Sequence, residues 1–131
     1  MKVGFDLDGT LDRPELAQLA RVLYDAGCEI HVITANAIAV AKYYQTREDK
    51  EKKLLRLGVL YTELHLAAGT TFSEVGQEKA RIIREQGIEV MFDDSTTFCN
   101  MMEEHSDAVI LRVREPNERV AAKLFSRYKR S

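Results

Sequence analysis

The chain has 131 residues, of which 45% are hydrophobic and 31% are charged. This length is typical of one domain, and the composition excludes a disordered or fibrous chain. Nineteen basic and 21 acidic side chains give a formal net charge of −2, which argues against a general nucleic-acid coat or a polybasic membrane binder. No apolar run reaches the length of a membrane-spanning helix, and no signal peptide precedes the first apolar segment. We therefore expect one cytoplasmic domain over residues 1–131, without membrane contact.

The cysteines and histidines predict neither a disulfide nor a zinc site. Cys28 and Cys99 lie far apart and form no metal-ligand pair, so we expect two buried thiols in a reducing compartment. The three histidines, His31, His65 and His105, are scattered along the chain. This scatter disfavours a zinc site, and we expect the first two to pack within or beside a sheet.

Short apolar runs alternate with longer segments that carry apolar side chains at helical spacing. The predicted strands are 2–7, 29–33, 61–66, 88–92 and 108–113. The predicted helices are 14–26, 37–57, 73–86, 96–104 and 116–129. This alternation is typical of βαβ units. We expect an α/β fold, a Rossmann-like three-layer α/β/α sandwich around a mostly parallel five-stranded sheet. The charge-rich run 47–53 is expected to form a solvated helix face.

Polar residues follow several predicted strands, at the edge of the sheet where parallel α/β folds bind ligands. Asp6 and Asp8 end the first strand, and residues two apart in an extended segment point the same way, so their carboxylates can converge. The run 34–36 (Thr-Ala-Asn) precedes a predicted helix, whose free N–H groups favour an anion. The other charged candidates are Lys79 within a helix, and Asp93 and Asp94 after the fourth strand.

These side chains suit a magnesium site for phosphoryl transfer. Clustered carboxylates raise one another's pKa unless a cation joins them. Oxygen ligands with few histidines favour Mg²⁺, which takes one or two carboxylates together with a substrate phosphate. A threonine hydroxyl and a lysine add donors for the phosphoryl oxygens, so a nucleophile, an acid or base and a metal are all available.

The order of these motifs resembles that of the haloacid dehalogenase-like phosphohydrolase superfamily, over residues 3–95. The first motif, Val-Gly-Phe-Asp-Leu-Asp-Gly-Thr-Leu at 3–11, is highly specific. The second, residues 32–34, and the third, Lys79, gain weight from their order and spacing. The fourth, residues 91–94, follows a clear strand. The resemblance implies a Mg²⁺-dependent phosphatase that hydrolyses a phosphomonoester.

The resemblance also implies a role for each matched residue. Asp6 attacks phosphorus and becomes an aspartyl-phosphate. Asp8 protonates the leaving oxygen and then deprotonates the hydrolytic water, a role that a raised pKa would suit. Thr34 hydrogen-bonds the phosphoryl group, and Lys79 neutralises charge on Asp6 and on the phosphoryl oxygens.

A metal site and a substrate site follow from the same resemblance. Mg²⁺ is bound by Asp6, by the backbone carbonyl of Asp8, and by Asp93 or Asp94, between which the sequence does not decide. The further candidates for substrate contact are Gly9, Thr10, Ala35 and Asn36. Asn36 is equally suited to cap the following helix.

Most members of this superfamily carry a cap domain, inserted after the first motif or after the third strand. Here 18 residues separate Gly9 from Cys28 and 12 separate Leu66 from Lys79, so neither gap holds a cap. By this resemblance, a capless, open site fits a bulky substrate such as a nucleic-acid end or a phosphoprotein, and nucleotides or nucleic-acid ends are the first substrates to test. A homo-oligomer that supplies a lid is left open. The small hairpin flap that usually follows the first motif in this superfamily is shortened here to residues 10–13, and we expect Arg13 within it to reach the substrate and partly replace the flap.

Two other functions compete with a phosphatase. A non-catalytic domain of this fold would bind or regulate, but it has no need for Asp8 and Lys79 together. A receiver-type signalling domain also uses an acidic pair, a threonine, a lysine and a phospho-accepting aspartate. In a receiver that aspartate follows a middle strand, whereas here the Asp-x-Asp-Gly-Thr motif opens the chain. We therefore favour the phosphatase.

Overall fold

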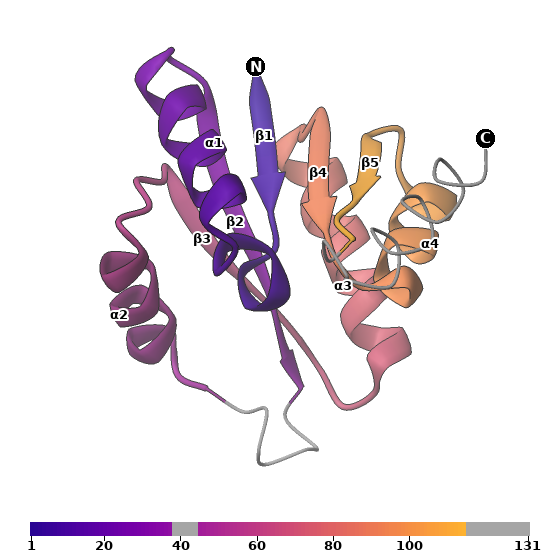
Figure 1. Ribbon diagram of the computed structural model, residues 1–131. Coiled ribbons are helices and arrows are strands. Elements are labelled where there is room, and N and C mark those ends of the chain that lie inside the picture. Colours follow the sequence, from indigo (N-terminus) through magenta and orange to yellow (C-terminus); the bar gives the residue numbers. More distant parts are fainter. Residues whose placement is uncertain (38–44, 115–131) are drawn as a thin grey trace, which may run out of the picture.

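The computed structural model describes residues 1–37 and 45–114, so the last predicted helix, 116–129, lies outside the described residues. It has a five-stranded sheet with helices on both faces (Figure 1). The strands are β1 (Lys2–Phe5), β2 (Glu29–Ala37), β3 (Glu63–Gly69), β4 (Val90–Asp93) and β5 (Val109–Arg112). The helices are α1 (Pro14–Asp25), α2 (Arg47–Leu57), α3 (Phe72–Gln86) and α4 (Thr96–His105). A short turn, η1 (Leu7–Leu11), follows β1.

The sheet has the strand order β3-β2-β1-β4-β5, and each neighbouring pair is parallel. Phe5 at the end of β1 is in register with Val32 of β2 and with Phe92 of β4. Because all strands run the same way, their carboxyl ends meet at one edge. The expected α/β, Rossmann-like fold with three layers is confirmed.

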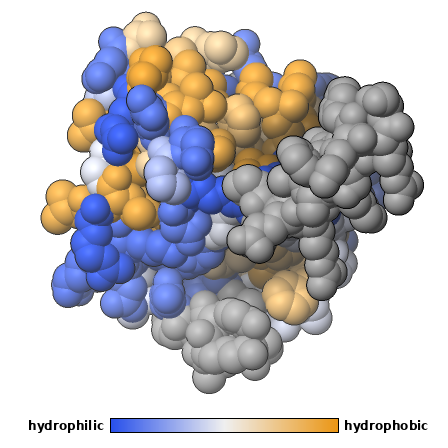
Figure 2. Space-filling view, viewed as in Figure 1, coloured by the Kyte–Doolittle hydropathy of each residue, from blue (hydrophilic) through white to orange (hydrophobic). Residues whose placement is uncertain are grey.

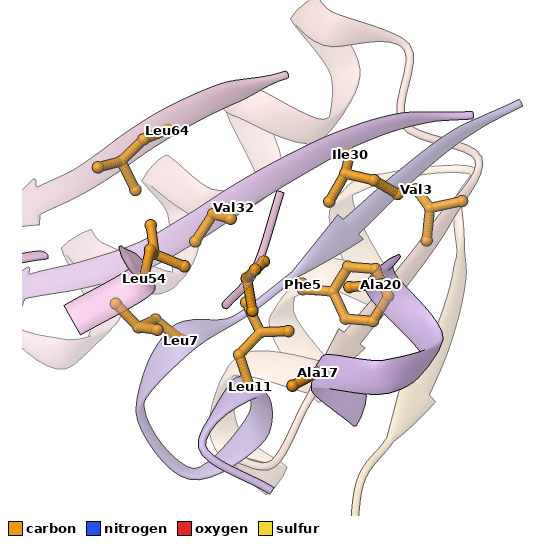
Figure 3. Packing of buried hydrophobic residues seen from close by; sticks show 11 residues of the cluster. Val3, Phe5, Leu7, Leu11, Ala17, Ala20, Ile30, Val32, Leu54 and Leu64 are labelled. Atoms are coloured by element: carbon orange, nitrogen blue, oxygen red, sulfur yellow. The ribbon is translucent and has the colours of Figure 1, made fainter. Parts of the chain in front are cut away.

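One face of the sheet is covered by α1, η1 and α2, which share a buried apolar cluster (Figure 3). Phe5 of β1 is fully buried and stacks on Phe92, with the ring centroids 4.9 Å apart. Leu54 lies on the inner side of α2 and packs in the same cluster as Leu7 and Val32. This packing fixes α2 against the sheet beside the turn that follows β1.

The opposite face is covered by α3 and α4. Val75 and Ile83 of α3 and Met102 of α4 pack in a second buried cluster with Ile33 of β2 and Met91 of β4. Apolar side chains recur along α3 at helical spacing, so its buried face is continuous from Val75 to Ile83. The same face carries Lys79 to the carboxyl edge of the sheet.

The structure describes both cysteines and the four helices α1 to α4. Both cysteines are free, as expected; Cys99 is buried, whereas Cys28 is only partly buried. Among the described helices, none has the length and apolar character needed to cross a bilayer.

The prediction of a strand at 29–33 followed by a helix from residue 37 is wrong at this boundary. β2 continues to Ala37, because seven of its residues pair with β3, from His31 opposite Glu63 to Ala37 opposite Gly69. α2 begins only at Arg47. Its start is fixed by a capping box: the Thr46 hydroxyl accepts from the Asp49 N–H at 3.1 Å, and the Asp49 carboxylate accepts from the Thr46 N–H at 3.0 Å.

Two adjacent leucines of α2 test this packing. Leu54 is fully buried, whereas Leu55 is 81% exposed. We expect Leu54→Ala to lower the free energy of unfolding by about 2–5 kcal/mol, because it leaves a cavity. Leu55→Ala should change it by less than about 0.5 kcal/mol. Urea unfolding measures both, and equal effects of the two substitutions would show that α2 does not pack as described.

Candidate active site

The strand order reverses direction at β1. The chain passes from β1 to β2 and β3 on one side, and then places β4 and β5 on the other side of β1. Open α/β sheets bind ligands at such a reversal, outside the carboxyl ends of the strands. Asp6 directly follows β1 and Asp93 ends β4, and the Asp6 N–H donates to the Phe92 carbonyl at 2.8 Å. The two aspartates therefore lie at the position where this fold binds ligands.

Lys79 of α3 joins these two aspartates. Its Nζ lies 3.0 Å from Asp6 Oδ1 and 2.7 Å from Asp93 Oδ2. Lys79 and Asp93 are fully buried, and Asp6 is nearly so. The Phe98 ring of α4 covers the ammonium, with its centroid 4.7 Å from Nζ. Because a buried charge without a partner is strongly destabilising, the three groups depend on one another.

The charges of this triad do not cancel, since one ammonium faces two carboxyl groups. Burial raises the pKa of Asp6 well above its ordinary value; Lys79 opposes this shift and Asp93 adds to it. Burial acts to lower the pKa of Lys79, but the carboxylates of Asp6 and Asp93 outweigh it, so the pKa is raised and the ammonium stays charged. A further cation beside Asp6 would favour its ionised form.

The residues present fit a divalent cation at this place. Asp6, Asp93 and Asp94 each offer a carboxylate oxygen, and the three oxygens lie within 4.8 Å of one another. Asp93 is engaged at both oxygens, because Oδ2 accepts from Lys79 and Oδ1 accepts from the Ser95 N–H at 2.9 Å. Asp94 is only partly buried, and its Oδ1 lies 3.5 Å from the Thr10 hydroxyl. That hydroxyl is also 3.4 Å from Asp6 Oδ2.

Gly9 allows Asp94 to approach the turn η1. Gly9 has a φ of +82°, and a Cβ atom added to it would lie 2.2 Å from Asp94 Oδ2. The turn is held by the Asp12 carboxylate, which accepts from the Gly9 N–H at 3.1 Å, and by Arg13 Nε, which donates to the Gly9 carbonyl at 2.7 Å. Arg13 thus braces the turn in this structure, and its expected contact with a substrate stays a prediction.

Asp8 lies in the same turn, but its carboxylate faces α2. Lys50 Nζ is 2.7 Å from Asp8 Oδ2, and Lys53 Nζ is 2.6 Å from Asp8 Oδ1. Burial would raise the pKa of Asp8, yet the hydrogen bonds from the two lysines outweigh it and the pKa is lowered. Asp8 therefore lacks the raised pKa that a proton-donating role would suit, because two ammonium groups that the sequence does not reveal flank its carboxylate.

The solvated face expected for residues 47–53 is also wrong in part. Figure 2 shows hydrophilic residues gathered over α2, but Lys50 within this helix is only 1% exposed. Lys53 contacts Asp8 and lies 3.3 Å from Asp12. A signal was present in the sequence: Lys50, Leu54 and Leu57 are spaced four and three residues apart, so one helix face carries all three.

The predicted residues after the second strand lie within β2 itself. Thr34 and Asn36 are buried, and the Ala35 side chain packs against the cluster under α3. Both residues lie inside β2, which continues to Ala37, so Asn36 caps none of the described helices and no described helix N-terminus follows Thr34. Within the part of the chain that the structure describes, Thr34 Oγ1 and Asn36 Oδ1 are buried without a hydrogen-bond partner. Buried polar atoms in this state suit a ligand that supplies the missing partner.

The structure thus brings together only part of the predicted site. Asp6, Thr10, Lys79, Asp93 and Asp94 form one contiguous group, with Gly9 against Asp94. The Asp8 carboxylate points to the α2 lysines, which the sequence reading did not include.

No protein-family model matches the sequence, and no curated protein matches it. Solved structures with a similar fold include a chain of the Pnkp1/Rnl/Hen1 RNA repair complex, 18% identical, with a TM-score of 0.67 and 86% of the present chain covered. They include a D,D-heptose bisphosphate phosphatase from B. bronchiseptica, solved with magnesium and phosphate, 14% identical, with a TM-score of 0.59. A universal stress protein in complex with cAMP is 11% identical, with a TM-score of 0.58.

The coverage of these structures differs. The present chain spans only 42% and 45% of the length of the two RNA-repair chains that it matches. It covers 99% of the heptose bisphosphate phosphatase and 96% of the universal stress protein. At these identities the likeness shows the fold alone. That fold is Rossmann-like α/β, as the sequence led us to expect.

The ion pairs of Asp8 predict a pH dependence of stability. Because the folded-state pKa of Asp8 is lowered, its ion pairs stabilise the fold above the ordinary value of 3.8, and this contribution is lost as the pH falls through the lowered pKa. We expect Asp8→Asn to be destabilising at neutral pH. The difference from the wild type should shrink below pH 3.8. Urea unfolding over a pH series measures it, and a difference that stays constant with pH would contradict the ion pairs.

Proposed function

We propose that the protein is a Mg²⁺-dependent phosphatase that hydrolyses a phosphomonoester through Asp6. The observation that carries this proposal is the buried Asp6–Lys79–Asp93 triad at the strand-order reversal, with Asp94 and Thr10 beside it. A purely structural ion pair does not need two carboxyl groups on one ammonium with a third carboxylate within reach. A site that holds a cation beside a nucleophilic carboxylate does, because the three carboxyl groups can bind the cation and the cation favours the ionised form of Asp6.

Asp6 is the nucleophile in this proposal. A carboxylate oxygen of Asp6 attacks phosphorus, the bond from phosphorus to the leaving oxygen breaks, and an aspartyl-phosphate forms. Lys79 stays charged, holds one Asp6 oxygen at 3.0 Å and offsets the negative charge that gathers on the phosphoryl oxygens. Water then attacks phosphorus and frees Asp6 and inorganic phosphate.

Asp6, Asp94 and the backbone carbonyl of Asp8 are the proposed holders of Mg²⁺. Asp94 is preferred over Asp93, because Asp93 has both oxygens engaged by Lys79 and the Ser95 N–H. Asp93 instead positions Lys79. When bound, the cation supplies positive charge that lowers the pKa of Asp6 and stabilises the phosphoryl oxygens.

We propose that Asp8 accepts a proton during hydrolysis, because its two lysine partners keep its carboxyl group ionised. With Lys50 and Lys53 on its two oxygens, Asp8 is held as a carboxylate. A carboxylate can accept the proton of the hydrolytic water, but it has no proton to give to a leaving oxygen. Phosphates whose leaving groups depart without a proton, such as aryl phosphates and phosphoanhydrides, suit this arrangement best.

Thr34 and Asn36 are proposed to bind the substrate, since each has a buried oxygen without a partner in the described residues. The side chain of Ala35, which lies between them, packs into the core, so Ala35 can contact the substrate only through its backbone. Gly9 and Thr10 place their turn beside Asp94 and Asp6. The gaps after Gly9 and after Leu66 are too short for a cap domain, and a site without a cap favours a bulky substrate. Together with the likeness to a chain of an RNA repair complex, this makes a nucleotide or nucleic-acid end the first class to test. Within it, the phosphoanhydride of a nucleotide fits the ionised Asp8 better than a nucleic-acid end, whose alkyl leaving oxygen needs a proton that Asp8 does not hold.

Hydrolysis of an aryl phosphate tests the proposal. We expect turnover that needs Mg²⁺ and is abolished by a chelator, and a loss of about 1,000-fold or more in Asp6→Asn, which lacks the nucleophile. Asp25→Asn, at the exposed end of α1, is the matched control and should keep full activity. A panel of nucleotides, phosphorylated oligonucleotides and phosphopeptides then identifies the substrate class.

Two results would contradict the proposal. One is turnover that is independent of Mg²⁺, and the other is an Asp6→Asn variant as active as the wild type. If the folded wild type hydrolyses no phosphate of the panel, a non-catalytic binding or regulatory domain replaces the phosphatase.

A pair of glycines tests the place of Asp94. Gly9 and Gly27 both have positive φ, so Ala costs about 1–2 kcal/mol of stability at either position. Only at Gly9 does the added Cβ collide with Asp94, because nothing lies within 4 Å of a Cβ at Gly27. We expect Gly9→Ala to lower kcat/KM by about 100-fold through displacement of Asp94, and Gly27→Ala to leave it unchanged. Equal kcat/KM values for the two variants would show that Asp94 is not part of the active site.

A further inference from the structure

Four titratable side chains on β2 and β3 form a cluster away from the carboxyl edge. Glu29 and His31 are two residues apart on β2, and Glu63 and His65 are two residues apart on β3, so each pair shares one side of its strand. The strands pair with His31 opposite Glu63 and Ile33 opposite His65. Parallel pairing in this register gathers all four side chains on one face of the sheet.

The donor atoms of three of these residues surround a common point. His31 Nδ1 lies 3.0 Å from His65 Nε2, and Glu63 Oε2 lies 4.0 Å from the first atom and 3.8 Å from the second. In a tetrahedral zinc site, with ligands about 2.0–2.1 Å from the metal, neighbouring donor atoms are roughly 3.3 Å apart. We propose that His31, His65 and Glu63 form a Zn²⁺ site that links β2 to the edge strand β3.

The surroundings of His31 support metal binding. Histidines that bind a metal usually give their second ring nitrogen to a carboxylate, which fixes the tautomer and the ring orientation. Here His31 Nε2 lies 3.2 Å from Glu29 Oε1, which leaves Nδ1 to face His65 and Glu63. Glu29 is thus a positioning residue for the site.

The site is also accessible and has suitable charge. The His31 side chain is 2% exposed and that of His65 11%, but the Glu63 side chain is 52% exposed, so solvent reaches one side of the cluster. Glu29 and Glu63 both face the cluster and bring negative charge to it, which favours a cation.

This site is separate from the proposed phosphatase centre. It shares no residue with Asp6, Asp93 and Asp94, the second cluster of metal-binding groups within the described residues. A set of two histidines and one glutamate suits Zn²⁺, whereas three carboxylates suit Mg²⁺. The inference therefore stands whether or not the protein hydrolyses phosphates.

Calorimetric titration of the tag-free protein with ZnCl₂, in excess Mg²⁺ to fill the carboxylate cluster, tests the site. We expect one Zn²⁺ per chain, a rise in the melting temperature with Zn²⁺, and a visible spectrum typical of tetrahedral Co²⁺ when cobalt replaces zinc. His65→Ala and Glu63→Gln should each weaken Zn²⁺ binding by about 100-fold, and Glu29→Gln by about tenfold.

Two control variants keep the test specific. His105→Ala changes the histidine on α4, outside the cluster, and should bind Zn²⁺ like the wild type. Asp94→Asn alters the other cluster and should also keep Zn²⁺ binding. The exposed Glu63 can be replaced with little effect on folding, so Glu63→Gln remains informative if His65→Ala is unstable. No Zn²⁺ binding by the wild type, or binding that Glu63→Gln and His65→Ala leave unchanged, would show that the two imidazoles only hydrogen-bond each other.

Discussion

The ammonium group of Lys79 lies between two buried carboxyl groups, and the arrangement of the carboxyl edge depends on it. Asp6 follows β1, Asp93 ends β4, and Lys79 reaches both from α3, so three elements meet at one charge. Without the ammonium, two carboxyl groups would be buried side by side, which is costly unless they take up protons. With it, Asp6 is fixed at the end of β1, close to Asp94 and Thr10, in a place where a cation and a phosphoryl group can both be bound.

Much of this could be predicted from the sequence, because the relevant signals are local. Strand and helix periodicity with glycines at three helix ends predicts the βαβ order, and the parallel sheet then brings residues 6, 93 and 94 to one edge. Lys79 is on the apolar face of its helix, four residues from both Val75 and Ile83, so its burial follows from spacing alone. The roles of these residues in catalysis remain proposals, since a likeness of fold does not test them.

What could not be predicted depends on strand register and on contacts between distant segments. The length of β2 is set by its pairing with β3, which overrides the expected helix start at residue 37. The lysines that hold Asp8 are more than 40 residues away from it in the chain, so its lowered pKa has no local signal. His31 and His65 are likewise 34 residues apart, and only the register of β2 against β3 places their rings together. For that reason the positions of the histidines along the chain do not reveal that two of their rings meet.

Chemical trapping of the covalent intermediate tests whether Asp6 is the nucleophile. The protein is mixed with an aryl phosphate and Mg²⁺, quenched, reduced with borohydride and mapped by mass spectrometry. Reduction converts an aspartyl-phosphate into homoserine. We therefore expect homoserine at position 6, and its formation should need both the substrate and Mg²⁺. Turnover without conversion at Asp6, or conversion at Asp8 or Asp93 instead, would contradict it.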